Sequence, residues 1–270
     1  MFDFLHRYEP SAILLTAGPL KIYWYGFFLV LAGVAALLVI LRLSRHYKIA
    51  NELIWDLASY WIVGAVIGAR LYYVIYSWSY FREHLIEIPM VWNGGLAIHG
   101  LILGGFGAML IYARIKKINF WVLADIFAPA LALAQACGRW GNYFNQEIFG
   151  RPTNLPWAIP IDLRHRPEAY SNFTYFHPTF LYESLGNFLI FTLLMIWHYR
   201  RAARGENKFS PGLIFVAYLG LYSLLRFVME FLRVDYSPLI FGFRVAQIVS
   251  LFIVFLVGIF LLSRRFRSRK

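Results

Sequence analysis

Seven apolar segments, each about 20 residues long, are the feature that most constrains this chain. A transmembrane helix needs about 20 mostly apolar residues to cross the hydrocarbon core of a bilayer. The segments span residues 20–41, 54–76, 95–113, 119–137, 178–198, 211–231 and 242–263. With 60% hydrophobic and only 15% charged residues, the 270-residue chain has more apolar side chains than one water-soluble core of this size holds. We therefore predict an all-α polytopic membrane protein with seven transmembrane helices, and exclude a soluble enzyme, a disordered chain and a coiled coil.

The seven spans predict a single transmembrane domain over residues 1–270. Residues 151–176, between the fourth and fifth spans, form a small extracytoplasmic insertion in this scheme. Its four prolines would stiffen a cap, although a spacer or a mobile gate is an equally open interpretation. The first residues lack the basic region of a cleavable signal peptide, so we expect an interfacial segment followed by a retained first span.

The basic residues predict the orientation of the chain in the membrane. Of 26 Lys and Arg residues, 15 lie in one set of alternate loops and nine in the other, with Arg70 and Arg226 inside spans. Since cytoplasmic loops are enriched in Lys and Arg, the N-terminus is predicted outside and the C-terminus in the cytoplasm. The 15 inside residues are Arg42, Arg45, Lys48, Arg114, Lys116, Lys117, Arg200, Arg201, Arg204, Lys208, Arg264, Arg265, Arg267, Arg269 and Lys270. The net charge of +12 therefore reports mainly topology and anionic lipid, and no nucleic-acid partner is expected.

Polar residues within the spans gather in their outer halves. They are Tyr25, Arg70, His99, Arg139, Asn142, His177, Glu183, Arg226, Glu230 and Arg233, whereas the inner half holds chiefly Asp56 and Asp125. An ion or solute carrier needs polar groups near the midplane or along a path through the membrane. A site that is polar only toward the outer leaflet suits a lipid headgroup, and arginines suit its phosphate. The pattern predicts an anionic phospholipid as ligand.

Other interpretations of these residues stay open at this point. Arg226 and Glu230 are also explained as a neutralising ion pair, His99 as a helix-packing residue and Glu183 as a partner of a neighbouring helix. A transporter for anions or lipids, a membrane scaffold and a metal-dependent headgroup transferase are the competing functions. The single cysteine, Cys137, excludes an internal disulfide framework and a Cys-rich zinc site.

One polar, glycine-rich run carries a specific resemblance. Residues 138–151 read GRWGNYFNQEIFGR, and this run closely resembles the signature of the prolipoprotein diacylglyceryl transferase family. Further matching motifs are IYWYG at 22–26, GARLYYV at 68–74, GGLAIHGLILGG at 94–105, HPTFLYES at 177–184 and YSLLRFVMEFLR at 222–233. The resemblance covers essentially the whole chain. It departs at Gln146, where the family usually has glycine, and this leaves the local backbone in question.

The resemblance implies transfer of a diacylglyceryl group from phosphatidylglycerol to the lipobox cysteine in the signal peptide of a preprolipoprotein. The products are a thioether and glycerol phosphate. It further implies the bacterial cytoplasmic (inner) membrane as location, membrane lipids as surroundings, an active site toward the outer leaflet, and no metal or diffusible cofactor. Carried over by motif, the catalytic residues are His99, Arg139 and Arg226. The residues that bind and support phosphatidylglycerol are Tyr25, Asn142, Glu147, Gly150, Tyr222, Glu230 and Arg233.

General chemistry suggests a role for each of these groups. A thiol attacks as thiolate, and His99 is the side chain best suited to remove its proton near neutral pH. Arg139 and Arg226 would stabilise charge on the phosphate leaving group. We expect Glu147 and Glu230 to orient the arginines, and Asn142 and Tyr25 to contact the headgroup.

Overall fold

The computed structural model describes residues 2–203 and 211–267, which are mostly helical. Six helices in these ranges are long and apolar enough to cross a membrane, namely Trp24–His46, Asn51–Tyr76, Ile98–Ile115, Phe120–Phe144, Thr179–Arg201 and Val245–Arg264. A seventh apolar helix, α8, covers Leu213–Met229 and is one residue short of that class at 17 residues. The chain is therefore a polytopic membrane protein. Of the inside basic residues, Arg204, Lys208, Arg269 and Lys270 lie outside the described residues, and the side chains of Arg265 and Arg267 are not described.

The elements occur in the order α1 (Phe2–Arg7), β1 (Ile13–Ala17), β2 (Leu20–Tyr23), α2 (Trp24–His46), α3 (Asn51–Tyr76), α4 (Trp78–Phe81), α5 (Ile98–Ile115), α6 (Phe120–Phe144), β3 (Ile159–Pro160), β4 (Tyr175–Phe176), α7 (Thr179–Ala203), α8, β5 (Leu239–Ile240), β6 (Phe243–Arg244) and α9 (Val245–Arg267). Short 3₁₀ turns cover Leu85–Glu87, Val91–Asn93, Leu163–His165 and Glu168–Tyr170. The strands pair as β1–β2, β3–β4 and β5–β6, all antiparallel. The expectation of a purely helical chain is therefore corrected, because segments joining the helices satisfy their backbone groups by strand pairing.

Two predicted span boundaries are wrong in an informative way. The first span was expected from residue 20, but residues 20–23 form strand β2 and the helix begins at Trp24. The fourth was expected to end at residue 137, yet α6 continues to Phe144. Gly138 and Gly141 suggest a break in the sequence, but aromatic packing sustains the last turns: Phe144 stacks on Trp24 with ring centroids 4.3 Å apart. Arg139 and Asn142 consequently lie on the helix rather than after it.

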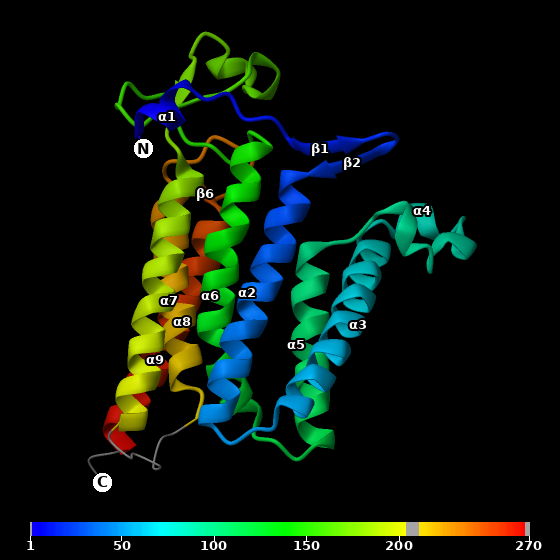
Figure 1. Cartoon of the computed structure of the whole chain (residues 1–270), viewed down its shortest axis with the longest axis vertical. Helices are drawn as coiled ribbons and strands as arrows, with labels where there is room; N and C mark the ends of the chain where they lie inside the picture. Colours follow the sequence, from blue (N-terminus) through cyan, green and yellow to red (C-terminus); the bar gives the residue numbers. More distant parts are fainter. Residues whose placement is uncertain (1, 204–210, 268–270) are drawn as a thin grey trace. The chain divides into compact units, whose positions relative to one another are not determined.

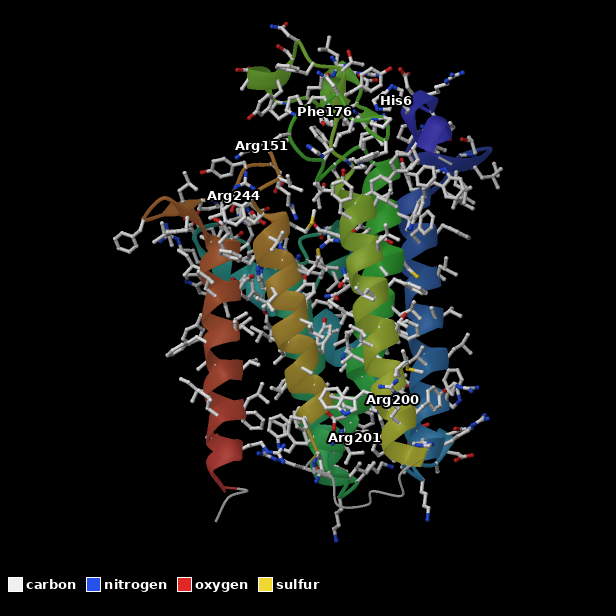
Figure 2. The ribbon with its side chains drawn as sticks, turned by 90° about the vertical axis from the view of Figure 1, so that its left-hand side faces the viewer. His6, Arg151, Phe176, Arg200, Arg201 and Arg244 are labelled. Carbon is white, nitrogen blue, oxygen red and sulfur yellow. The ribbon has the colours of Figure 1, made fainter. Side chains whose placement is uncertain are left out.

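The chain divides into two compact units, residues 1–39 with 127–270, and residues 40–126. In the first unit, α6, α7, α8 and α9 run side by side, with α1 and residues 151–176 at one end (Figure 1). Arg151 and Arg244 lie toward that end, and Arg200 and Arg201 lie at the opposite end (Figure 2). We call α1 together with residues 151–176 the cap.

The cap has an apolar core of its own. Leu5, Phe149, Ile159, Ile161 and Phe176 are buried together with residues at the ends of α6 and α7. His6 stacks on the Tyr175 ring at 4.2 Å and its Nδ1 lies 3.0 Å from the Ala158 carbonyl oxygen. The N-terminal segment, expected to be interfacial, thus packs Leu5 into protein.

The second unit is built on the pair α3 and α5. Their backbones approach closely at Gly64, Gly68, Gly100 and Gly104, where an added Cβ would lie 2.2–2.5 Å from an atom of the facing helix. Small residues permit such approach between helices in lipid. Residues 78–97, which include α4 and two 3₁₀ turns, connect the two helices.

Candidate active site

Glu183 is the point on which three arginines of the first unit converge. Its carboxylate is buried in α7, with 3% of the side chain exposed, and pairs with Arg139 Nη2 at 2.5 Å. Arg233 Nη1 and Arg226 Nη1 lie 3.6 and 3.7 Å from Glu183 Oε1. A buried carboxylate needs compensating charge, and here α6, α8 and the turn after α8 all supply it.

A second set of ion pairs extends this cluster toward α9. Glu230 accepts Arg226 Nη2 at 2.7 Å and Arg244 Nη1 at 3.0 Å. Arg233 Nε donates to Asp235 at 2.7 Å, and Arg244 Nη2 donates to the Asp235 carbonyl oxygen at 2.7 Å. We call the whole set the arginine network: Arg139, Arg226, Arg233 and Arg244 with Glu183, Glu230 and Asp235. Four guanidinium groups face three carboxylates, so the network carries one net positive charge.

Ion pairing prevails over burial at the outer end of the network. Burial by itself lowers the pKa of the Arg233 guanidinium, but the hydrogen bond and charge of Asp235 raise it overall. Burial likewise favours protonation of Asp235, yet Arg233 holds the pKa of that carboxyl below its ordinary value. Both groups stay charged near neutral pH.

The signature run forms a tight turn after α6 and joins the network through Asn142. Asn142 Nδ2 donates to Glu147 at 2.7 Å, and Arg139 Nη1 donates to Asn142 Oδ1 at 3.4 Å. Glu147 also accepts from Asn145 at 3.5 Å. Glu147 thus contacts amides and reaches Arg139 only through Asn142, whereas Glu230 contacts arginines directly.

Gln146 has the left-handed backbone conformation that glycine adopts freely, with φ 51°. Its side chain is buried and bridges two segments. Nε2 donates to the Pro10 carbonyl oxygen at 2.9 Å, and Oε1 accepts from the Asp162 amide at 2.6 Å. These two hydrogen bonds tie the turn to both parts of the cap and offset the backbone strain of the non-glycine residue.

Gly150 is required by close packing. An added Cβ would lie 2.7 Å from His177 Cβ, 2.9 Å from Thr179 Cγ2 and 3.1 Å from the Leu232 carbonyl oxygen. The Gly150 amide donates to the His177 carbonyl oxygen, and Gly150 pairs with Arg233 in an isolated antiparallel bridge. This position holds the signature turn against α7 and the end of α8.

Tyr25 and Tyr222 lie beside the same unit's polar residues. Tyr25, at the start of α2, faces Gly141, whose added Cβ would lie 2.8 Å from the Tyr25 ring. Tyr222 precedes Arg226 by one helical turn and stacks on Tyr218 with centroids 5.8 Å apart. His177 is half-buried, its Nδ1 lies 3.2 Å from the Tyr182 hydroxyl, and burial lowers the pKa of its imidazole.

His99 belongs to the second unit. It is the second residue of α5 and stacks on Tyr72 of α3 with ring centroids 5.7 Å apart. The first unit therefore brings together Arg139, Asn142, Glu147, Gly150, Arg226, Glu230 and Arg233, and places Tyr25 and Tyr222 on the adjoining turns. His99 is described in its own unit alone.

Sequence reasoning misses three members of the network. Glu183 is visible as a charge inside a span, a strong signal for function, but nothing in the sequence assigns it three arginine partners. Arg244 counts only as an outer-loop charge, and Asp235 carries no motif. Their partners come from other helices, which the linear sequence does not reveal.

Comparisons with known proteins agree with the motifs. The family model described as prolipoprotein diacylglyceryl transferase matches residues 12–264. The chain belongs to this family. It is 44% identical over 243 residues to the phosphatidylglycerol–prolipoprotein diacylglyceryl transferase of Trichormus variabilis, covering 90% of this chain and 86% of that protein. The protein of the same name from Synechococcus elongatus is 45% identical, with 90% and 83% covered. Membership of the prolipoprotein diacylglyceryl transferase family makes this a membrane-embedded bacterial transferase.

Proposed function

We propose that this protein transfers the sn-1,2-diacylglyceryl group of phosphatidylglycerol to the lipobox cysteine thiol of a prolipoprotein. The cysteine sulfur attacks the glyceryl carbon that carries the phosphate, a carbon–sulfur bond forms, and the carbon–oxygen bond to phosphate breaks. The thiol proton passes to a base, and glycerol phosphate leaves. This reaction is the first step of lipoprotein maturation, and both relatives described above are named for it.

The arginine network is the observation that carries this proposal. Its net positive charge matches the single negative charge of a phosphodiester, and the leaving phosphate develops a second. Arg226 Nη1 is buried and makes no hydrogen bond to another described residue, with only the 3.7 Å contact to Glu183 nearby. A buried donor without an acceptor is costly, and an anionic headgroup oxygen would satisfy it.

Arg139 and Arg226 act in this proposal by stabilising the leaving phosphate with charge-assisted hydrogen bonds. Glu183, Glu230 and Asp235 hold the guanidinium groups in place before the substrate arrives. Asn142 and Tyr25 contact the glycerol headgroup, and His99 accepts the thiol proton.

We further propose that the seven helices all span the membrane, with the N-terminus outside and the C-terminus in the cytoplasm. The basic residues Arg200 and Arg201 lie at the end of the first unit opposite the cap (Figure 2). This separation supports a cytoplasmic-membrane enzyme whose cap and arginine network lie at the outer leaflet.

The test is a reaction of the purified protein with phosphatidylglycerol and a lipobox peptide, followed by mass spectrometry. We expect the peptide to gain one diacylglyceryl group, and to gain none when its cysteine is serine. Arg226→Gln should abolish the adduct, because the leaving phosphate loses a buried donor. Absence of the adduct with wild-type protein that retains bound lipid would refute the transferase and favour lipid transport.

His99 is tested in the same assay with His99→Gln. A glutamine keeps a polar side chain of similar length but accepts no proton near neutral pH. Full transfer by this variant would remove the base assignment while leaving the overall reaction in place.

A further inference from the structure

We propose that Arg70 is a positioning residue that braces the loop leading into α5 and thereby fixes His99. The inference rests on the proposed function, because it assigns Arg70 a role in the step that uses His99. Arg70 is a buried charge inside a membrane span, and such residues are expensive to keep. The arginine network does not include it.

Arg70 directs its guanidinium to backbone carbonyls. Nε donates to Ile88 O at 2.7 Å and Nη2 to Glu87 O at 2.5 Å. Nη1 donates to Gly94 O at 2.8 Å and to Gly95 O at 3.2 Å. Within the described ranges of the chain, no carboxylate pairs with Arg70. The fork of an arginine is the one side chain that reaches several acceptors in this way.

The two carbonyl groups of acceptors lie at both ends of one loop. Glu87 and Ile88 close its first 3₁₀ turn, while Gly94 and Gly95 lie just before α5. Gly94 and Gly95 have φ of 83° and 68°, a conformation that favours glycine. A Cβ on Gly95 would lie 2.7 Å from Arg70 Nη1 and 2.5 Å from the Tyr73 ring, so the loop closes directly over the guanidinium.

The brace is connected to His99 by a short rigid path. The Ala97 amide donates to the Ala69 carbonyl oxygen at 3.1 Å, immediately before α5 begins at Ile98. Gly100, the residue after His99, is in backbone contact with Gly68. Arg70 itself stacks 5.1 Å from the Phe81 ring centroid, which excludes water from one face. The first turn of α5 therefore takes its position from residues 68–70.

Saturation of its donors separates Arg70 from the headgroup-binding arginines. With four hydrogen bonds to carbonyl oxygens, its guanidinium has little capacity left for a phosphate. Its positive charge is met by carbonyl dipoles alone. We infer that Arg70 acts on the reaction only through the loop and His99.

The decisive experiment is a double-mutant cycle of Arg70→Gln and His99→Gln in the diacylglyceryl transfer assay. We expect Arg70→Gln to lower kcat tenfold or more, with the KM for phosphatidylglycerol changing less than threefold. In the His99→Gln background, Arg70→Gln should cause no further loss, because the group it positions is gone. The matched control is Arg82→Gln, an exposed arginine of the same connecting segment paired only with its neighbour Glu83, and it should keep wild-type activity.

Amide hydrogen exchange of residues 87–97 gives a readout independent of turnover. Arg70→Lys keeps the charge but not the fork, and it serves where Arg70→Gln does not yield folded protein. We expect faster exchange in this segment for the Arg70 variants and unchanged exchange for Arg82→Gln. Unchanged exchange in Arg70→Lys, or equal losses from Arg70→Gln in both backgrounds, would overturn the proposal. A wild-type protein without transfer activity would instead refute the proposed function itself.

Discussion

At the scale of single residues, the surroundings of a side chain decide its role more than its type does. Arg70 and Arg226 are both arginines inside spans, and the sequence treats them alike. One donates to four carbonyl oxygens, while the other shares two carboxylates with three further arginines. Glu183 and Glu83 differ in the same way, because the first is buried among arginines and the second is exposed beside one.

Removing the central carboxylate should disable the arginine network. We expect Glu183→Gln to cost about 3–5 kcal/mol of stability, because it leaves several buried guanidinium groups without their partner. Diacylglyceryl transfer should fall by roughly 10–100-fold as Arg139 and Arg226 lose their fixed positions. Thermal unfolding in detergent and the peptide transfer assay measure the two effects. Glu83→Gln is the control, and equal behaviour of the two variants would contradict the role of Glu183.

Gln146 tests how side-chain hydrogen bonds compensate backbone strain. The left-handed conformation costs a non-glycine residue about 1–2 kcal/mol, and each of its two hydrogen bonds returns about 0.5–1.5 kcal/mol. We expect Gln146→Gly to stay within about 1 kcal/mol of wild type, because it loses both the strain and the bonds. Gln146→Ala keeps the strain without the bonds and should unfold at the lowest temperature of the three. Equal midpoints for Gly and Ala would show that the backbone at this position is not strained.

His177 makes stability depend on pH in a stated direction. Burial lowers the pKa of its imidazole, so the folded protein holds it neutral more strongly than the unfolded chain does. The stabilisation it contributes is present above the ordinary pKa of about 6.5 and is lost as pH falls below that value. The unfolding midpoint should drop from pH 7.5 to pH 5.5, and His177→Gln should show a smaller drop. An identical drop in both proteins would assign the effect to other groups.

At the scale of elements, pairs of helices are held by contacts that their apolar composition does not predict. The Gly64xxxGly68 and Gly100xxxGly104 spacings are common in apolar segments by chance. In this structure they bring α3 and α5 into backbone contact, and Gly107 on the same α5 faces open space. The same spacing signal thus separates into packing glycines and free ones only after the helices are placed.

This difference gives a matched pair of substitutions. Gly104→Ala would put a methyl group 2.2 Å from the Gly64 carbonyl oxygen, and separating the helices should cost about 1–3 kcal/mol. Transfer should fall as well, because α5 carries His99. Gly107→Ala meets nothing within 4 Å and should leave both properties unchanged. Unfolding midpoints and transfer rates decide between them, and a harmless Gly104→Ala would argue against the close α3–α5 contact.

At the scale of the whole molecule, the distribution of charge predicts the orientation that we propose. Cytoplasmic loops retain basic residues, and the cap would then face outward. In a Cys137→Ser background, a membrane-impermeant thiol reagent applied to intact cells should label Glu168→Cys in the cap. It should label Arg114→Cys at the end of α5 only after the membrane is opened. The reverse pattern would invert the topology.

The sequence by itself determines the membrane class, the positions of the apolar helices and the family. These follow from properties that are local along the chain, namely hydrophobic length and short motifs. Helix ends were less predictable, because α6 continues past two glycines through aromatic packing of Phe144 on Trp24. Pairing of the outer segments into short strands was also missed, since strand partners lie on other parts of the chain.

Only the tertiary structure decided which charges meet. Arg139, Arg226, Arg233 and Arg244 are spread over more than 100 residues, and Glu183 and Asp235 become their partners through the packing of α6, α7, α8 and α9. The same holds for Arg70, whose acceptors are carbonyl groups that every residue possesses. Backbone acceptors have no sequence signature, and the energy of a buried ion pair depends on distance in space. For that physical reason, the motifs named the family and several site residues, while the folded chain alone shows which of them act together.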